Sequence, residues 1–219
     1  MRVPISFGAR LLALALISPL PARAACSPPA QVLEYTVRWS GTTIGKQRVV
    51  FEQAGDRISV STTSRVSASL LFVTLIELEH QSTEIWANGR LLSFSGRTVD
   101  NGRTVEVTVA RAENGYLVTR NGEQMRVPMD AISGSLWCAD SVARPGPGTF
   151  VDLVKGRTGP VTVSPMMPED IVVRGTTLPT KHVEITGTQE REVWYDAVGK
   201  PVRVRFPAKM GPKVSVELD

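Results

Sequence analysis

The chain has 219 residues, of which 42% are hydrophobic and 6% aromatic, and its formal net charge is +4. A chain of this length and hydrophobicity is able to bury one sizeable core, as a soluble globular protein does. Its basic residues form neither a stripe nor a run interleaved with aromatic side chains, which excludes nucleic acid as the expected partner.

The first 24 residues have the pattern of a secretory signal peptide. Two arginines precede a short apolar stretch (residues 11–17), and Ala22 and Ala24 supply the small residues that a signal peptidase reads. We therefore expect cleavage after Ala24 and a periplasmic mature chain, residues 25–219. The leader holds three arginines and no acidic residue, so the mature chain is nearly neutral, with 22 basic against 21 acidic residues. No later segment reaches the roughly 18 consecutive apolar residues of a membrane helix, so we expect no membrane span in the mature chain.

The first part of the mature chain predicts strands joined by tight turns. In "LEYTVRW" (33–39) and "RTVEVTVAR" (103–111), apolar and polar residues alternate, as in strands with one buried face. Asn-Gly tolerates the positive φ of a hairpin turn and occurs four times, at residues 88–89, 101–102, 114–115 and 121–122. This spacing predicts an antiparallel meander.

One stretch, "SASLLFVTLIELEHQSTEIW" (67–86), is ambiguous because the apolar run at 70–76 suits either a buried strand or a buried helix. Its aromatic and β-branched residues favour one long, kinked strand, and a helix is the alternative. Residues 129–142, "MDAISGSLWCADSV", are the best candidate for a short helix, with Asp130 as its cap.

Strand-like sequence continues to the C-terminus. Pro- and Gly-rich stretches at residues 143–150 and 165–168 predict loops or edges, because alternation resumes beyond them, as in "PVRVRF" (201–206) and "KVSVEL" (213–218). We predict a single all-β domain over residues 25–219. It is a large antiparallel meander of about ten to twelve strands, curved into a half-barrel or barrel-like shape, with at most one short helix.

The chain has only two cysteines, Cys26 and Cys138. Because an exported protein enters an oxidising space, we predict that they form a disulfide. In one alternative Cys26 is lipidated, although Arg23 stands where lipid-modified cysteines normally have a leucine-like residue. In the other, Cys138 is a nucleophile whose base is His80 or His182, neither of which has a recognisable catalytic context.

Other constellations carry little chemistry. The cysteines and histidines lack the close pair spacing of zinc sites, so we expect neither a metal nor a cofactor. Acidic pairs such as Glu77/Glu79 and Glu190/Glu192 are interpreted as solvated strand faces. We predict no catalytic residue.

Aromatic residues suggest a binding role. If the sheet curls into a barrel or half-barrel, its inward residues enclose a cavity suited to a lipophilic ligand, and a filled core is the alternative. The predicted cavity-lining residues are Trp39, Phe72, Trp86 and Trp137.

Three stretches carry a family resemblance: "LEYTVRWSGTTIGKQRV", "EHQSTEIWANGRLLSFSGRTVDNG" and "EVWYDAVGKPVRVRF". The matching residues are Gly41, Ile44, Gly45, Glu84, Trp86, Gly89, Leu91, Asn101, Gly102, Trp194, Tyr195, Asp196, Gly199, Val202 and Phe206. In these residues the chain resembles an uncharacterised family of exported Gram-negative bacterial proteins known only as a domain of unknown function. The resemblance implies a large curved antiparallel sheet and an exported protein, and it supplies no activity.

These observations favour a non-enzymatic periplasmic protein that binds a lipophilic small molecule or an envelope component in its concave face. One alternative is a structural or interaction module with a filled core that docks an envelope protein. A second is a Cys138-dependent enzyme, either a hydrolase or a redox enzyme.

Overall fold

The computed structural model describes residues 26–70, 73–208 and 211–219. Sixteen strands and one 3₁₀ helix, η1 (Ala139–Val142), lie in these ranges. The strands are β1 (Val32–Trp39), β2 (Thr42–Ala54), β3 (Arg57–Leu70), β4 (Val73–Ala87), β5 (Arg90–Asp100), β6 (Arg103–Ala112), β7 (Gly115–Arg120), β8 (Glu123–Val127), β9 (Ile132–Ser133), β10 (Gly146–Asp152), β11 (Arg157–Val163), β12 (Met167–Val173), β13 (Thr176–Gly187), β14 (Arg191–Tyr195), β15 (Pro201–Phe206) and β16 (Val214–Leu218).

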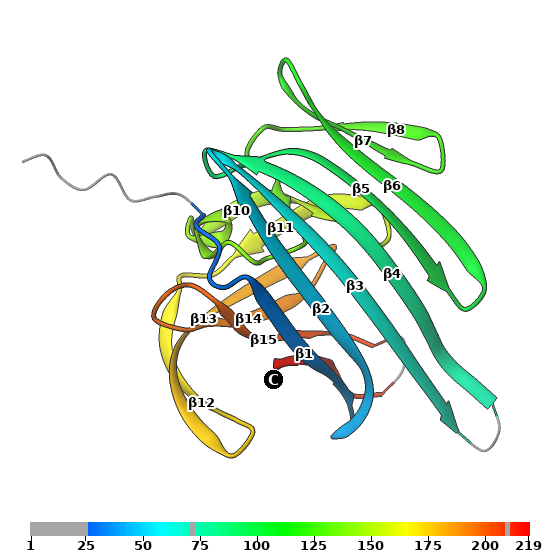
Figure 1. Cartoon of the computed structure of the whole chain (residues 1–219), viewed down its shortest axis with the longest axis vertical. Helices are drawn as coiled ribbons and strands as arrows, with labels where there is room; N and C mark the ends of the chain where they lie inside the picture. Colours follow the sequence, from blue (N-terminus) through cyan, green and yellow to red (C-terminus); the bar gives the residue numbers. More distant parts are fainter. Residues whose placement is uncertain (1–25, 71–72, 209–210) are drawn as a thin grey trace, which may run out of the picture.

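All sixteen strands belong to one sheet, in the order β8-β7-β6-β5-β4-β3-β2-β1-β16-β15-β14-β13-β11-β10-β9, with β12 paired to β13 outside this path. Neighbouring strands are antiparallel except β9 and β10, which run parallel. Figure 1 shows the long strands β1–β6 curving around an interior that β10–β15 face from the other side. The prediction of an all-β, antiparallel, curved meander is confirmed. Within the described residues, no helix has the length and apolar character needed to span a membrane.

The sheet is barrel-like without being a closed ladder. Its first and last strands, β8 and β9, are not hydrogen bonded to each other among the described residues. Side chains bridge this opening instead: Arg120 Nε donates to the Lys155 carbonyl oxygen over 2.9 Å, and Thr98 Oγ1 donates to the Val154 carbonyl oxygen over 2.8 Å. The turn between β10 and β11 therefore holds the two ends of the sheet together.

Three of the predicted Asn-Gly turns occur as expected. Asn88, Asn101 and Asn121 have φ of 51°, 50° and 47°, and the glycine after each also has a positive φ. The fourth turn falls one residue earlier, because Gly115 is already the first residue of β7. These turns thus determine that each strand from β4 to β8 pairs with the next one along the chain.

The preference for strand over helix in residues 67–86 is confirmed for the described residues, but the expectation of one continuous strand was wrong. The chain reverses inside this stretch: β3 ends at Leu70, β4 starts at Val73, and Ser69 pairs with Thr74. No glycine, asparagine or proline marks the reversal, so the sequence has no turn signal at this point.

Other boundaries also differ from the predictions. The 3₁₀ helix η1 covers only the last four residues of the predicted helix 129–142. Its N-cap residue is Cys138, which makes no side-chain capping hydrogen bond, so the prediction of Asp130 as the cap was wrong. The strand count exceeds ten to twelve because the proline-rich stretches contain strands. Pro168 lies in β12, which pairs only with β13 among the described strands, and proline is tolerated at such a sheet edge.

Candidate functional site

Residues 134–138, here called the plug segment, follow β9 and lie inside the curved sheet. Trp137 is 4% exposed, and its ring contacts Phe51 and Trp86 edge to face, with centroids 5.3 and 5.1 Å apart. Such aromatic pairs add stability beyond the apolar area that they bury. The plug segment therefore fills one part of the interior with packed aromatic rings.

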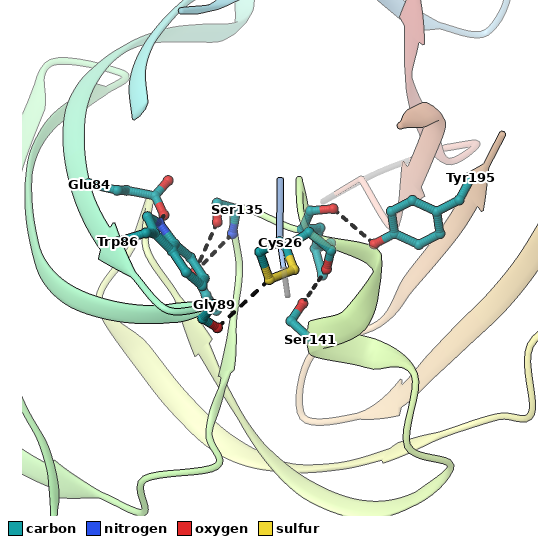
Figure 2. Close-up of a disulfide and its surroundings, with 10 residues drawn as sticks. Cys26, Glu84, Trp86, Gly89, Ser135, Ser141 and Tyr195 are labelled. Atoms are coloured by element: carbon teal, nitrogen blue, oxygen red, sulfur yellow. Dashed lines mark hydrogen bonds between the residues drawn. A yellow bond between two sulfur atoms is a disulfide. The ribbon is translucent and has the colours of Figure 1, made fainter. Parts of the chain in front are cut away.

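One disulfide and one hydrogen bond hold the plug segment in place (Figure 2). Cys138 forms a disulfide with Cys26, with the two Cα atoms 5.1 Å apart, and this bond attaches the N-terminal segment to the interior. The Tyr195 hydroxyl donates to the Leu136 carbonyl oxygen over 2.9 Å. Burial raises the pKa of Tyr195 well above its ordinary value, so this hydroxyl keeps its proton and stays a donor.

A buried carboxylate lies beside the plug segment. Glu84 is 1% exposed, and it accepts a hydrogen bond of 2.8 Å from Trp86 Nε1. Burial raises the pKa of Glu84 from its ordinary value of 4.5 to about 7, and hydrogen bonds with Trp86 and Ser135 oppose this rise. Figure 2 shows Glu84, Trp86 and Ser135 grouped on one side of the disulfide.

Beyond the plug segment the interior is hollow. A cavity of about 650 Å³ lies between the strands, and Gly134, Ser135 and Leu136 form part of its lining. The same short segment thus separates the cavity from the packed aromatic rings. The apolar lining comes mainly from β1–β4, β15 and β16, through Val37, Trp39, Ile44, Val66, Leu75, Ile76, Leu78, Val204, Phe206, Val214 and Val216.

The polar lining includes a buried histidine. The Thr98 hydroxyl donates to Val154, so it accepts from His80 Nδ1, 2.8 Å away, while the Ser82 hydroxyl lies 3.0 Å from Nε2. Burial lowers the pKa of His80 to about 4, although the charge of Asp152 opposes this shift. His80 is therefore a neutral, hydrogen-bonded part of the cavity wall at neutral pH.

An ion pair lies at the same cavity. Arg191 Nη2 is 3.6 Å from Asp152 Oδ2, and the side chains are 18% and 7% exposed. The guanidinium carbon also lies 5.6 and 5.2 Å from the ring centroids of Phe150 and Phe206, within the range of cation–π contacts. Gln47, Ser64 and Lys155 are further polar members of the lining. The cavity thus combines apolar walls with a partly buried charged group.

A comparison of the sequence with known protein families gives a match. The family model described as a domain of unknown function, DUF6134, matches residues 35–219. The chain belongs to the DUF6134 family. The match covers the whole sheet apart from the first residues of β1, so this fold is the one that DUF6134 describes.

Two solved structures are similar to this DUF6134 chain, and the first of them has the same fold. One is a beta-barrel-like protein of the DUF1849 family from Brucella abortus, with a TM-score of 0.56 and 9% identity over 86% of this chain and 94% of that one. Another is a DUF1089 family protein from Pseudomonas aeruginosa, with a TM-score of 0.46 and 8% identity over 80% and 95% of the two chains. No curated protein matches the sequence.

The four predicted ligand-binding residues have different positions in the DUF6134 fold. Trp39 lines the cavity, where its Nε1 donates to the Pro212 carbonyl oxygen over 3.1 Å. Trp86 and Trp137 lie instead in the packed aromatic group, and Phe72 lies outside the described residues. The structure brings Cys26 and Cys138 together as the predicted disulfide.

Sequence reasoning missed Arg191 and Asp152 as members of the cavity. Each lies at the end of a strand, and no spacing along the chain connects β10 with β14. The matched family residues Asp196 and Gly199 are turn residues: Asp196 Oδ1 accepts from the backbone amides of Val198 and Lys200, and Gly199 has a φ of 83°. This part of the family pattern therefore serves the fold.

Proposed function

We propose that this DUF6134 protein is a non-enzymatic binding protein that holds a lipophilic molecule in the cavity of its curved sheet. The observation that carries the proposal is the cavity of about 650 Å³ with apolar walls from β1–β4, β15 and β16. Pockets of roughly 300–1,000 Å³ with mainly apolar walls and few polar groups are typical small-molecule sites.

The lining suggests an amphipathic ligand. An apolar body fits against Val66, Val204 and Val216, while a polar head group is able to reach Arg191. The Arg191 guanidinium donates from Nη1 to the Glu190 carbonyl oxygen over 2.7 Å, and its Nη2 lies 3.6 Å from Asp152. A guanidinium has five N–H donors, so others remain for a ligand oxygen. We therefore propose a molecule with a long apolar part and one small polar or acidic group.

The state of the cysteine supports a role without catalysis. A cysteine nucleophile acts as a thiolate, and Cys138 is bonded to Cys26 in the oxidised protein. The disulfide and the leader pattern of residues 1–24, which lie outside the described residues, also support export to the periplasm. Fractionation of cells that express the full chain tests the export: the processed protein should appear in the periplasmic fraction with no free thiol.

Mass spectrometry of the purified protein tests the binding role. Under native conditions we expect a species heavier than the chain, and under denaturing conditions the release of a lipophilic molecule. A chain that carries nothing, and that also fails to bind a fluorescent fatty-acid analogue, would contradict the proposal.

Two matched variants place the ligand. Val66→Trp fills the cavity and should weaken binding of the analogue by about tenfold or more, because the ligand loses the space for its apolar body. The control is Val172→Trp on β12, where Val172 is 57% exposed and lies outside the cavity lining. Equal binding by both variants would show that the analogue binds elsewhere.

A further inference from the structure

A group of metal-ligating side chains lies on the outer face of the sheet, away from the cavity. His182 and Glu184 alternate along β13, and Glu192 lies on β14 directly opposite Glu184. One ligand atom from each of these three residues lies within 4.8 Å of the other two. The inward neighbours Val183, Ile185 and Val193 are buried in the core, so the three polar side chains share the opposite face.

The pairing of Glu184 with Glu192 is unfavourable without a cation. Like charges directly opposite each other on neighbouring antiparallel strands destabilise the pair. Lys213 Nζ lies 3.0 Å from Glu192 Oε1 and neutralises part of this charge. Arg205 lies on the next strand, with its guanidinium carbon 5.0 Å from the Trp194 ring centroid. The Arg203 guanidinium carbon also lies over that ring, at 5.8 Å, but Arg203 Nε is 3.0 Å from Glu217 Oε1 and so belongs to a separate ion pair. Glu169, Glu184 and Glu192 therefore outnumber Lys213 and Arg205.

Two atoms of the group are buried and have no hydrogen-bond partner. Among the described residues, the buried side-chain atoms without a partner are Glu192 Oε2, His182 Nε2 and two indole nitrogens. Buried polar atoms are nearly always hydrogen bonded, so an unpartnered acceptor requires an explanation, and an absent ion is one. Two such atoms in one cluster point to a ligand between them.

The other nitrogen of His182 has the partner that metal-binding histidines usually have. His182 Nδ1 lies 2.9 Å from Glu169 Oε2, on the neighbouring strand β12. A carboxylate at one ring nitrogen fixes the tautomer and directs the lone pair of the other nitrogen toward the metal. Trp194 stacks on the same ring, with centroids 4.3 Å apart and planes 2° from parallel, and so holds its orientation.

From this geometry we infer that His182, Glu184 and Glu192 bind a divalent transition-metal ion of the zinc type. Imidazole with two carboxylates suits zinc, whereas calcium and magnesium prefer oxygen ligands alone. Zinc ligands lie about 2.0–2.2 Å from the ion, so the ligand atoms must approach one another on binding. Glu184 is exposed and free to make this movement.

Calorimetric titration of zinc ions into the metal-stripped protein, with its disulfide intact, tests the site. We expect one zinc ion per chain and no comparable binding of calcium. His182→Gln and Glu184→Gln should weaken zinc binding at least about tenfold, and Glu169→Gln, which acts through His182, by about 10–100-fold. Glu79→Gln is the matched control, because Glu79 is an exposed carboxylate on β4 that lies 3.8 Å from Arg65 and, among the described residues, belongs to no cluster of three metal-ligating side chains.

Nuclear magnetic resonance gives a second readout that does not depend on the variants. The chain has only two histidines, so both imidazole rings can be followed separately. Zinc should shift the ring nitrogens of His182 and leave those of His80, which lines the cavity, unchanged. Unchanged zinc binding by His182→Gln, a shift of His80 alone, or no binding at millimolar zinc would overturn the inference.

Discussion

Single residues of this protein show how burial changes side-chain chemistry. Glu84 and His80 lie on the same strand, and burial moves the pKa of each toward the neutral form: up to about 7 for the acid and down to about 4 for the base. The two shifts affect stability in opposite directions. Buried Glu84 lowers the free energy of unfolding as pH rises from about 4.5 to about 7. Buried His80 lowers it as pH falls from about 6.5 to about 4.

Glu84→Gln should remove part of the pH dependence of stability. Between about pH 4.5 and 7 the unfolded chain loses the Glu84 proton while the folded chain keeps it. The free energy of unfolding therefore falls across this range, by about 3 kcal/mol for a shift of this size. The neutral amide does not titrate, so it contributes no such pH dependence. The free energy of unfolding of the variant should therefore rise relative to that of the wild type as pH rises. Urea unfolding at pH 4.5, 6 and 8 measures this difference, and parallel curves would contradict the assignment.

Arg191→Met should destabilise the protein because it leaves Asp152, 5% exposed, as a buried charge without its cation. We expect a loss of about 3 kcal/mol, and recovery of much of it when Asp152→Asn is added. Chemical unfolding of the single and double variants measures this coupling. Arg65→Met is the control: Arg65 pairs with Glu79 at 3.8 Å, but both side chains are more than half exposed, so stability should hardly change. Equal losses at the two pairs would contradict the role of burial.

At the scale of the element, local pattern predicted most strands, because alternation and Asn-Gly turns depend only on neighbouring residues. The reversal between β3 and β4 was missed because its residues are apolar, and β12 was hidden by Pro168. The candidate sites depend on pairing between strands. Glu192 meets Glu184 only through the register of β13 with β14, and Arg191 meets Asp152 only through the curvature of the sheet. Neither the strand register nor the curvature of the sheet can be deduced from residues that are neighbours in the sequence.

Gly45→Ala tests a close approach between β2 and β3. A Cβ atom at Gly45 would lie 2.2 Å from the Arg65 carbonyl oxygen and 2.8 Å from the Val66 Cα, both of which are backbone atoms. The strands must separate to accommodate it, which should cost about 1–3 kcal/mol. Gly148→Ala is the control, since its Cβ would meet only the Ile132 Cδ1 atom, at 3.4 Å. Thermal unfolding compares the two variants, and a Gly45→Ala protein as stable as Gly148→Ala would refute the contact.

At the scale of the whole molecule, a sheet that does not close on itself has to be held by other means. Here the β10–β11 turn bridges the ends of the sheet through Arg120 and Thr98, and the plug segment packs Trp137 into the interior. The disulfide then joins the plug segment to the N-terminal segment, across a sequence separation of 112. The part of the interior that these contacts do not fill is the cavity. Because the plug segment forms part of the cavity lining, its stability and the shape of the cavity are linked.

The double variant Cys26→Ala/Cys138→Ala tests this link. Removing a crosslink over so long a loop increases the entropy of the unfolded chain, and we expect the free energy of unfolding to fall by about 2–4 kcal/mol. The Sγ atom of Cys26 lies 3.7 Å from the Gly89 carbonyl oxygen at the β4–β5 turn, so the variant also frees that turn from the plug segment. Because Gly134–Leu136 line the cavity, binding of the fatty-acid analogue should weaken in parallel. Reductant should reproduce both effects in the wild type and leave the variant unchanged. A less stable variant with unaltered binding would separate the crosslink from the cavity and confine its role to stability.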